Sequence, residues 1–489
     1  MRKATWSRDR CARKDLPDYQ TAKVVVTARG EMNQLRGRAI ARIVLFIIVV
    51  SIAIVIRASV AASDIPLLGD AKTRYDPIAN SLLAGHGFSR DTAPPYRPDN
   101  FDQPGYPLML ASVYAITNRS TRAVVLVQLL LELLVLLAVI LIARELKLSR
   151  NAQILAVVIG LICPFLAKYA GLLLSEILAT LVISLACYAF MRSVRESPRN
   201  NLKWWAMAGL ASGISLLIRA DTLIVVMLIS AVAIILARPP SAKLRLLQTT
   251  VLIGSIVLTL TPWTIRNYLQ FKAFNPLGSV SAQAGLPYVK WLNTWLDSPA
   301  DLKPFWWDAM KTEEHLEPFP AAKIPDDDER NRAWSSLLQG REQKTMRGEP
   351  NRQFQELADE AGRKRPLQTF VVVPVRRLIK TLLYPQINRL PTLMGTRLPF
   401  FALQGLWLLL LGFSLLGVVQ AIRLKRFVVL LVVAVIIGRM LLPLISGLGA
   451  DPRLLVEILP LLYVLTAFGI SASYDLFRAK VSPIAQTPP

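Results

Sequence analysis

The sequence predicts an all-α polytopic membrane protein, and three observations carry this prediction. Of the 489 residues, 53% are hydrophobic, and the mean hydropathy is +0.42. Long apolar runs recur between Ala39 and Ser473, each close to the length of about twenty residues that a helix needs to cross a bilayer. The formal net charge of +24 collects in short segments between these runs, which indicates the positive-inside rule rather than a nucleic-acid partner.

We expect a bundle of about ten transmembrane helices. The predicted ranges are 39–60, 121–143, 152–168, 173–191, 204–219, 222–237, 247–264, 400–420, 428–446 and 454–474. The fifth and sixth ranges are short, so a tight hairpin is the alternative for that pair. The basic connectors "ARELKLSRN", "MRSVRESPRNNLK", "ARPPSAKLR" and "AIRLKRF" all fall on the side of the Arg-rich N-terminus. This side is therefore cytoplasmic, in a multi-pass protein of the cytoplasmic membrane.

The topology divides the chain into five parts. They are a basic tail (1–38) that we expect to be disordered, an N-terminal transmembrane module (39–264) with an outer loop (61–120), a large outer segment (265–399), the C-terminal transmembrane helices (400–474) and a second cytoplasmic tail (475–489). Met32 is an alternative start, which leaves open whether residues 1–31 belong to the natural protein. The first apolar run also resembles a signal peptide, but we expect a retained anchor with Arg57 snorkelling to the interface.

The first outer loop is unusually rich in charged residues for a segment beside a membrane. In "SDIPLLGDAKTRYDPIANSLLAGHGF" the apolar residues recur at helical spacing up to two glycines, which predicts a short helix at the membrane surface. The members of this pattern are Tyr75, Ile78, Ala79, Leu82 and Leu83, followed by Gly85 and Gly87. The later "PGYP" predicts a stiff turn that returns the chain to the membrane.

These motifs resemble one family specifically. An acidic residue outside the first span, then "RY…IA…LL..G.GF" and an acidic-X-Pro-Gly-Tyr-Pro turn, are similar to the C-type glycosyltransferases that use polyprenyl-phosphate sugars. The bacterial branch related to protein O-mannosyltransferases and to the lipid A aminoarabinose transferase is the most similar. The resemblance extends over residues 38–470, with the first loop the most specific part, and implies the fold of that family.

The resemblance also implies roles for individual residues. Asp70 takes the place of the catalytic base, Glu176 of an acidic partner at the second outer turn, and Asp102 of a third acidic site residue. Gln103 stands where the family has a lysine, so a cation for the donor phosphate must come from another position. Tyr75, Gln103, Tyr106 and His86 are the candidates for positioning the acceptor and the loop.

The chemistry explains why such residues lie at the membrane edge. The lipid tail of the donor stays in the bilayer, so its phosphate and its reacting sugar carbon lie at the outer ends of the helices. An incoming hydroxyl needs a carboxylate to accept its proton, and the leaving phosphate needs cations. The candidate cations are Arg219, Arg266, Lys168 and Arg453, with Arg376 and Arg377 as further outer arginines.

Each candidate also has a simpler interpretation. Asp70 can cap the following helix, Asp102 can form the turn before "QPGYP", and His86 can be a surface turn residue between two glycines. Arg219 can end a span with Asp221 as its partner, as Arg453 can with Asp451. The carboxylate of Glu176 at an apolar boundary is costly unless it is paired, which favours function.

The sequence does not predict a certain cofactor. The chain has two histidines, His86 and His315, which gives a His/Cys zinc site no support. A Mg²⁺ or Mn²⁺ site formed by Asp70, Asp102 or Glu176 stays open. The three cysteines, two of them in apolar runs, do not indicate a disulfide framework.

The large outer segment has a different character. Four tryptophans, Trp291, Trp295, Trp306 and Trp307, suit sugar rings or membrane interfaces, and anchoring at the interface is the favoured interpretation. Two or three charged helices should follow, and the last, near 371–384, is amphipathic and basic enough to lie on the bilayer. We expect this segment to form a lid or an acceptor platform.

The predicted function is therefore transfer of a sugar from a polyprenyl-phosphate donor, on the outer face of the membrane, to a lipid-linked glycan, lipopolysaccharide, cell-wall polymer or protein. A transporter or flippase for lipid-linked sugars is one alternative, and a non-catalytic assembly partner is another. Clustering of the acids at outer helix ends, without an internal repeat, favours the enzyme. The sugar, the acceptor and the oligomeric state stay open.

Overall fold

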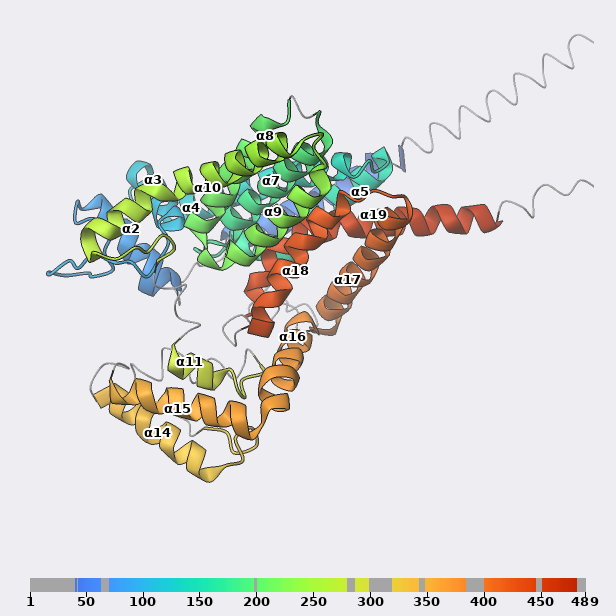
Figure 1. Ribbon diagram of the computed structural model, residues 1–489. Coiled ribbons are helices and arrows are strands. Elements are labelled where there is room, and N and C mark those ends of the chain that lie inside the picture. The colour runs from blue at the N-terminus through green and yellow to red at the C-terminus, as the bar shows by residue number, and fades with distance from the viewer. Residues whose placement is uncertain are drawn as a thin grey trace, which may run out of the picture. The chain divides into compact units, whose positions relative to one another are not determined.

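The computed structural model describes residues 40–41, 43–62, 70–197, 200–278, 286–298, 319–342, 348–383, 400–445 and 451–481, and no strand occurs among them (Figure 1). The chain divides into two compact units, Met1–Val55 and Ile56–Pro489. The first unit contributes the beginning of one apolar helix to the described residues, and all further elements belong to the second. The tail predicted over 1–38 lies outside the described residues.

The apolar helices follow the predicted order. They are Ile43–Ala62, α4 (Thr121–Glu145), α5 (Arg150–Ile162), α6 (Pro164–Ala170), α7 (Glu176–Arg195), α8 (Leu202–Ile218), α9 (Leu223–Ala237), α10 (Ala242–Phe271), α17 (Phe400–Arg423), α18 (Val429–Ile445) and α19 (Leu459–Val481). Seven described helices are long and apolar enough to cross a membrane, and the pair α5 and α6, bent by 53°, makes eight. Because each of the ten predicted ranges holds a helix, the all-α polytopic prediction is confirmed.

Several of the predicted spans contain helices of fewer than 18 residues: α5 has 13 and α9 has 15. Helices α8 and α18 have 17 residues each. Helix α8 ends because Arg219 adopts an extended backbone (φ −149°, ψ 114°), after which a 3-10 turn, η2 (Ala220–Thr222), leads into α9. The fifth and sixth predicted spans are therefore separate helices, and the break between them carries a charged side chain.

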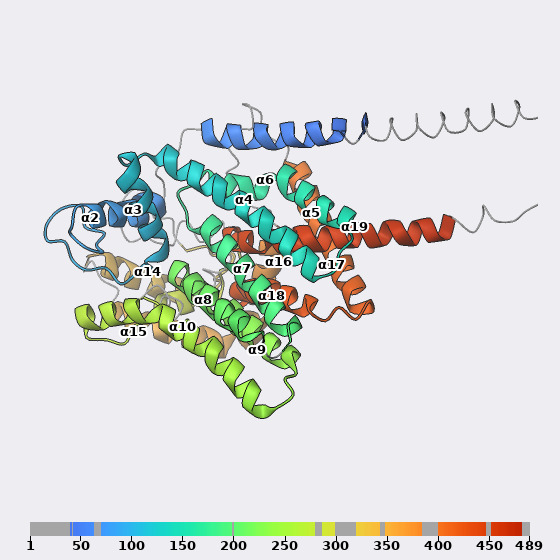
Figure 2. The same cartoon turned by 90° about the horizontal axis from the view of Figure 1, so that it is seen from above.

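Helix α19 is the most enclosed of the membrane helices, with 89% of its apolar window buried. It contacts α17, α5 and α4, and Figure 2 shows it running beside α17 and α5. A Cβ atom at Gly417 of α17 would overlap the carbonyl oxygen of Leu465 on α19. The two helices therefore pack backbone to backbone, as small residues allow in membrane proteins.

The first outer loop forms short helices at the predicted positions, and their place at the membrane surface stays a prediction. A short π-helical turn, η1 (Ala71–Tyr75), continues into α2 (Asp76–Leu83), and α3 (Gly105–Thr117) follows the "PGYP" element. Gly85 and Gly87 both have a φ of 79°, a conformation that favours glycine and ends the helix. The apolar side of α2 packs on α3, with Ile78 and Ala79 fully buried.

The position of Arg57 corrects one expectation. Its guanidinium does not snorkel to the interface, because Nη2 lies 2.7 Å from Oε1 of Glu132 on α4 and Nη1 donates to the Leu161 carbonyl oxygen at 3.0 Å. The side chain of Glu132 is fully buried. The reason is that Glu132 on the neighbouring helix offers a buried carboxylate, so the Arg57 guanidinium does not need water or lipid headgroups as its partner.

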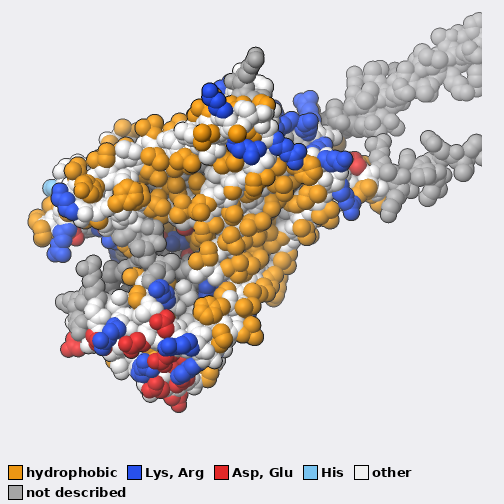
Figure 3. All heavy atoms as spheres, viewed as in Figure 1, with side chains coloured by type: hydrophobic (Ala, Val, Ile, Leu, Met, Phe, Trp, Pro, Cys, Tyr) orange, Lys and Arg blue, Asp and Glu red, His pale blue; other side chains and the backbone are white. Residues whose placement is uncertain are grey.

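The large outer segment has its own small core. Its described helices are α11 (Pro287–Leu292), α14 (Asp327–Glu342), α15 (Glu349–Lys364), the π-helical η4 (Gln368–Val372) and α16 (Val373–Leu383). The predicted charged helices are thus present, and Figure 3 shows acidic and basic side chains gathered on α14 and α15, while apolar side chains cover the membrane helices.

The prediction that Trp291 and Trp295 anchor the segment at the interface is wrong. Both side chains are buried, and they pack against Phe319 and Phe354 in the core between α11, α14 and α15. A small unit built from polar helices needs large aromatic side chains to form any core at all. Trp306, Trp307 and His315 lie outside the described residues.

Two groups of contacts order this segment. Arg377 on α16 donates to the carbonyl oxygens of Leu296 at 2.8 Å and of Asn293 at 2.9 Å, and also to Pro443 of α18 at 3.1 Å. The carboxylate of Asp297 accepts from Lys323 and Lys380, each at 2.9 Å. The arginine therefore ties the outer core to a membrane helix.

Candidate active site

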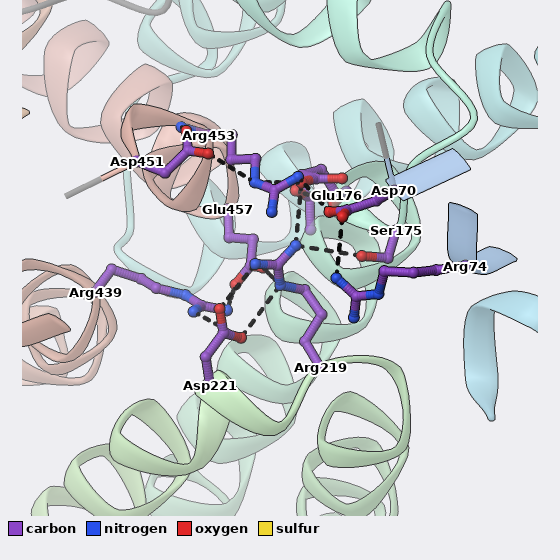
Figure 4. A network of polar contacts seen from close by, with 11 residues as sticks. Asp70, Arg74, Ser175, Glu176, Arg219, Asp221, Arg439, Asp451, Arg453 and Glu457 are labelled. Carbon is purple, nitrogen blue, oxygen red and sulfur yellow. Dashed lines mark hydrogen bonds and ion pairs between the residues drawn. The ribbon is translucent and has the colours of Figure 1, made fainter. Parts of the chain in front are cut away.

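A network of charged side chains lies where the first outer loop meets the ends of several membrane helices (Figure 4). Its members come from segments that are far apart in the chain: η1, the start of α7, the break between α8 and η2, the inside of α18, and the 3-10 turn η6 (Pro452–Ile458) that leads into α19. The residues are Asp70, Arg74, Asp102, Glu176, Arg219, Asp221, Arg439, Asp451, Arg453 and Glu457.

Asp70 joins the loop to the bundle. Its side chain makes no capping hydrogen bond to η1; instead Oδ2 lies 2.7 Å from Nη1 of Arg453 and Oδ1 lies 3.1 Å from Nη1 of Arg74. The simpler interpretation of Asp70 as a helix cap therefore does not apply. Burial raises the pKa of this carboxyl, but the charges of Arg453 and Arg74 outweigh it and hold the pKa below its usual range.

Asp102 lies on the other side of Arg74. The Nε atom of Arg74 donates to Oδ1 of Asp102 at 2.8 Å, while the buried Oδ2 has no hydrogen-bond partner among the described residues. Burial raises the pKa of Asp102, against the opposing charge of Arg74. Asp102 thus anchors the arginine that also holds Asp70.

Glu176 opens α7 and is almost completely buried within the network. Its Oε1 atom lies 3.1 Å from Nη1 of Arg219 and 3.8 Å from Nε of Arg453. Its Oε2 atom has no partner in the described part of the chain. The three predicted acids therefore meet in one network, connected by arginines.

A deeper layer holds Arg219 in place. Arg219 forms two hydrogen bonds to Asp221, at 3.2 and 2.8 Å, and its Nε atom lies 3.3 Å from Glu457. Arg439, inside α18, lies 3.2 Å from Asp221 and also pairs with Glu457. Asp221 is thus the partner of Arg219, as the simpler interpretation expects, but Arg219 also reaches Glu176.

Sequence reasoning missed three members of the network. Arg439 and Glu457 lie within predicted spans, where an ionisable residue is by default a functional candidate. Arg74 follows Asp70 by four residues, the spacing of neighbours on a helix. Signals for all three were therefore present in the sequence.

The two remaining candidate cations lie elsewhere. Arg266 donates to the carbonyl oxygens of Asp99 at 2.6 Å and Phe88 at 3.2 Å, and its guanidinium covers the Trp263 ring at 4.8 Å. These contacts tie α10 to the first outer loop, outside the network of Figure 4. Lys168 is buried on α6, with its ammonium 5.4 Å from the centre of the Tyr169 ring. Their role at the donor phosphate stays a prediction.

The candidate positioning residues mostly support the loop. The hydroxyl of Tyr106 donates to Gln128 at 3.0 Å, and its ring packs edge-on against Tyr75. The side chain of Gln103 donates to the carbonyl oxygen of Leu277. His86 is exposed and stacks on Tyr96 with ring centres 3.8 Å apart. Of these four, Tyr75 and Gln103 adjoin members of the network, and the Arg74 guanidinium lies 5.4 Å from the centre of the Tyr75 ring.

The acids do not form a cation site as placed. Among the described residues, no group of three or more His, Cys, Asp or Glu side chains is arranged to hold a metal ion. Asp70, Asp102 and Glu176 each face an arginine instead. An anion that enters the network would compete with these acids for the guanidinium groups.

The chain is similar to known proteins in two comparisons. Residues 97–265 match the family model described as dolichyl-phosphate-mannose-protein mannosyltransferase. Two solved structures of ArnT from Cupriavidus metallidurans, in the apo state and bound to undecaprenyl phosphate, are both 16% identical to this chain. They cover 91% of it and 80% and 81% of their own chains, with TM-scores of 0.41 and 0.40. Among curated proteins, none matches the chain.

The family match bears on the site as well as on the fold. The matched residues include Asp102, Glu176 and Arg219, while Asp70 precedes them and Arg453 follows. The match covers about a third of the chain and includes the acidic-X-Pro-Gly-Tyr-Pro turn, but it begins after the helical part of the first outer loop. Over residues 97–265 the chain is therefore similar to this mannosyltransferase family, and this similarity, together with the helical membrane fold, supports a membrane glycosyltransferase.

Proposed function

We propose that the chain transfers a sugar from a polyprenyl-phosphate donor to a hydroxyl group of an acceptor on the outer face of the cytoplasmic membrane. The acceptor is a lipid-linked glycan, lipopolysaccharide, a cell-wall polymer or a protein. One observation carries the proposal: an ionised carboxylate, Asp70, lies between two guanidinium groups where the first outer loop meets the bundle. Base and phosphate-binding cations are thus side by side.

The reaction needs both kinds of group. The acceptor oxygen bonds to the anomeric carbon, the bond from that carbon to the phosphate oxygen breaks, and its electron pair leaves with the phosphate. Asp70 accepts the hydroxyl proton, and in-line attack inverts the anomeric centre. Arg453 and Arg74 stabilise the charge that grows on the leaving phosphate.

The other acids act on these groups rather than on the substrate. Asp102 fixes Arg74 by its contact to Nε at 2.8 Å. Glu176 lies between Arg219 and Arg453 and orients both. We assign Asp102 and Glu176 as positioning residues and Asp70 as the base.

The test compares the wild type with Asp70→Asn and Asp76→Asn at matched membrane levels, with release of polyprenyl phosphate from labelled carrier-linked sugars as the readout. Asp76 is the matched control, because it is an acid of the same loop whose carboxylate accepts from the Tyr114 hydroxyl at 2.7 Å and from Asn80 at 3.0 Å.

Loss of turnover in Asp70→Asn alone is the expected result, with a decrease on the order of 100-fold or more for removal of a general base. Equal turnover in all three proteins would contradict the assignment of Asp70 and move the base to Glu176 or Asp102. A wild type that turns over no carrier-linked sugar would contradict the enzyme itself and favour transport of lipid-linked sugars or an assembly role.

A further inference from the structure

We propose that the donor phosphate displaces Asp70 from Arg453, so that binding of the donor itself frees the base. The inference rests on the proposed function and deepens it. It assigns to one ion pair, Asp70 with Arg453 at 2.7 Å, the coupling between donor binding and proton transfer.

The charges of the network imply that a bound phosphate displaces a carboxylate from an arginine. Its four arginines, Arg74, Arg219, Arg439 and Arg453, face six carboxylates, those of Asp70, Asp102, Glu176, Asp221, Asp451 and Glu457. Every guanidinium group already has a carboxylate partner. A phosphate adds negative charge to a site in which acids outnumber arginines, so it must take a cation from one of them.

Arg453 is the arginine that an incoming phosphate reaches most readily. Its side chain is 32% exposed, against 19% for Arg74, 10% for Arg219 and 0% for Arg439. It begins the segment that leads into α19, at the outer end of a predicted span. A phosphate held there by a lipid tail lies at the depth where the sugar bond breaks.

The geometry of Arg453 allows one partner to be exchanged while others remain. Asp70 contacts Nη1, whereas the Nε side of the guanidinium faces Asp451 at 3.0 Å and Glu176 at 3.8 Å. A phosphate oxygen that replaces the Asp70 carboxylate at Nη1 leaves these two contacts intact. The arginine therefore stays in position during the exchange.

Asp70 also keeps a partner when it leaves Arg453. The guanidinium of Arg74 lies 3.1 Å from its other oxygen, and Arg74 is itself anchored by Asp102. The carboxylate stays at the site but loses the stronger of the two charges that lower its pKa. Its pKa then rises towards the ordinary value, which makes it a better acceptor for the hydroxyl proton.

Release of polyprenyl phosphate restores the ion pair between Asp70 and Arg453. Cleavage turns the phosphodiester of the donor into a monoester, which carries more negative charge and holds Arg453 more firmly. When polyprenyl phosphate departs, Arg453 regains Asp70, and the returning positive charge drives the proton from Asp70 to water. Proton and charge are thus balanced over one turnover.

The test measures the dissociation constant of undecaprenyl phosphate for the full chain in detergent micelles, by calorimetry. Asp70→Asn removes the competitor of the phosphate, so its dissociation constant should fall about fivefold below that of the wild type, although turnover is lost. Asp70→Glu, which keeps the competing charge, should bind like the wild type. Asp76→Asn is the control for removing an acid from the loop and should also bind like the wild type.

Arg453→Gln, alone and combined with Asp70→Asn, completes a double-mutant cycle. It should weaken binding, and in the double variant the Asp70→Asn change should no longer tighten it, because the cation for which both anions compete is absent. If Asp70→Asn does not yield monodisperse protein, Asp70→Ala removes the same charge and carries the same expectation.

The outcomes separate the inference from the proposed function. If the neutral variant binds undecaprenyl phosphate as the wild type does, or more weakly, Asp70 does not compete for Arg453 and the displacement is overturned, while the enzyme assignment stands. If the wild type does not bind undecaprenyl phosphate, the proposed function is overturned together with the displacement.

Discussion

The buried pair of Arg57 and Glu132 permits a quantitative prediction about the first helix. Arg57→Leu removes a guanidinium that lies 2.7 Å from a fully buried carboxylate and 3.0 Å from the carbonyl oxygen of Leu161. The other carboxylate oxygen of Glu132 has no partner among the described residues, so the substitution leaves the acid uncompensated in the bundle. Breaking a buried pair in this way costs about 3–5 kcal/mol.

The double variant Arg57→Leu/Glu132→Leu removes both charges together. Replacement of a buried ion pair by apolar side chains is often neutral or stabilising, and the remaining cost is the lost donor to Leu161, about 1 kcal/mol. We therefore expect the double variant to unfold within about 1 kcal/mol of the wild type. Arg57→Lys keeps the charge and should lose less stability than Arg57→Leu.

Equilibrium unfolding in mixed micelles, followed by circular dichroism, gives the free energy of unfolding for all four proteins. A neutral effect of Arg57→Leu would refute the reasoning and would mean that Arg57 lies at the interface. Equal destabilisation in the single and double variants would also refute it, because the cost would then arise from lost packing rather than from the unpaired carboxylate.

Three further predictions concern packing and pH. Trp291→Ala should destabilise the outer segment by about 3–5 kcal/mol, measured by thermal unfolding, because the side chain is fully buried in a small core. A cost below about 1 kcal/mol would indicate that this side chain lies at the membrane interface instead. Gly417→Ala should destabilise the bundle by about 1–3 kcal/mol, since the new Cβ would overlap the Leu465 carbonyl oxygen. An unchanged melting temperature would contradict the close packing of α17 and α19. The charges of Lys323 and Lys380 outweigh the burial of Asp297 and lower its pKa. The ionised carboxylate therefore contributes about 1 kcal/mol to the free energy of unfolding above the pKa of the unfolded state, and this contribution is lost as the pH falls through the pKa of the folded state. The stabilities of the wild type and Asp297→Asn should converge in acid, and a difference that does not change with pH would show that the charge is not involved.

The sequence determined the architecture because the bilayer imposes a simple rule. Backbone groups in the hydrocarbon must bond within a helix, so apolar runs of sufficient length predict helices directly. All ten predicted ranges contain one. The first outer loop was equally readable, because Gly85 and Gly87, both with positive φ, mark the end of α2.

Aromatic and charged side chains were less predictable where their partners are distant in the chain. Tryptophans such as Trp291 and Trp295 are typical of membrane-interface anchors, and only the packing of α11 against α15 shows that these two lie in a core. Arg57 reads as a snorkelling residue until Glu132, 75 positions later, is seen beside it.

The candidate site also has a part that the sequence predicts and a part that only the structure shows. Its acids were recognisable one by one, since Asp70 and Asp102 lie in motifs and Glu176 lies at an apolar boundary. Their pairing was not, because Asp70 and Arg453 are separated by 383 positions. Local sequence determines where a charge sits along its helix and at which membrane edge. Which opposite charge it meets depends on how the helices pack, and only the tertiary structure decided that.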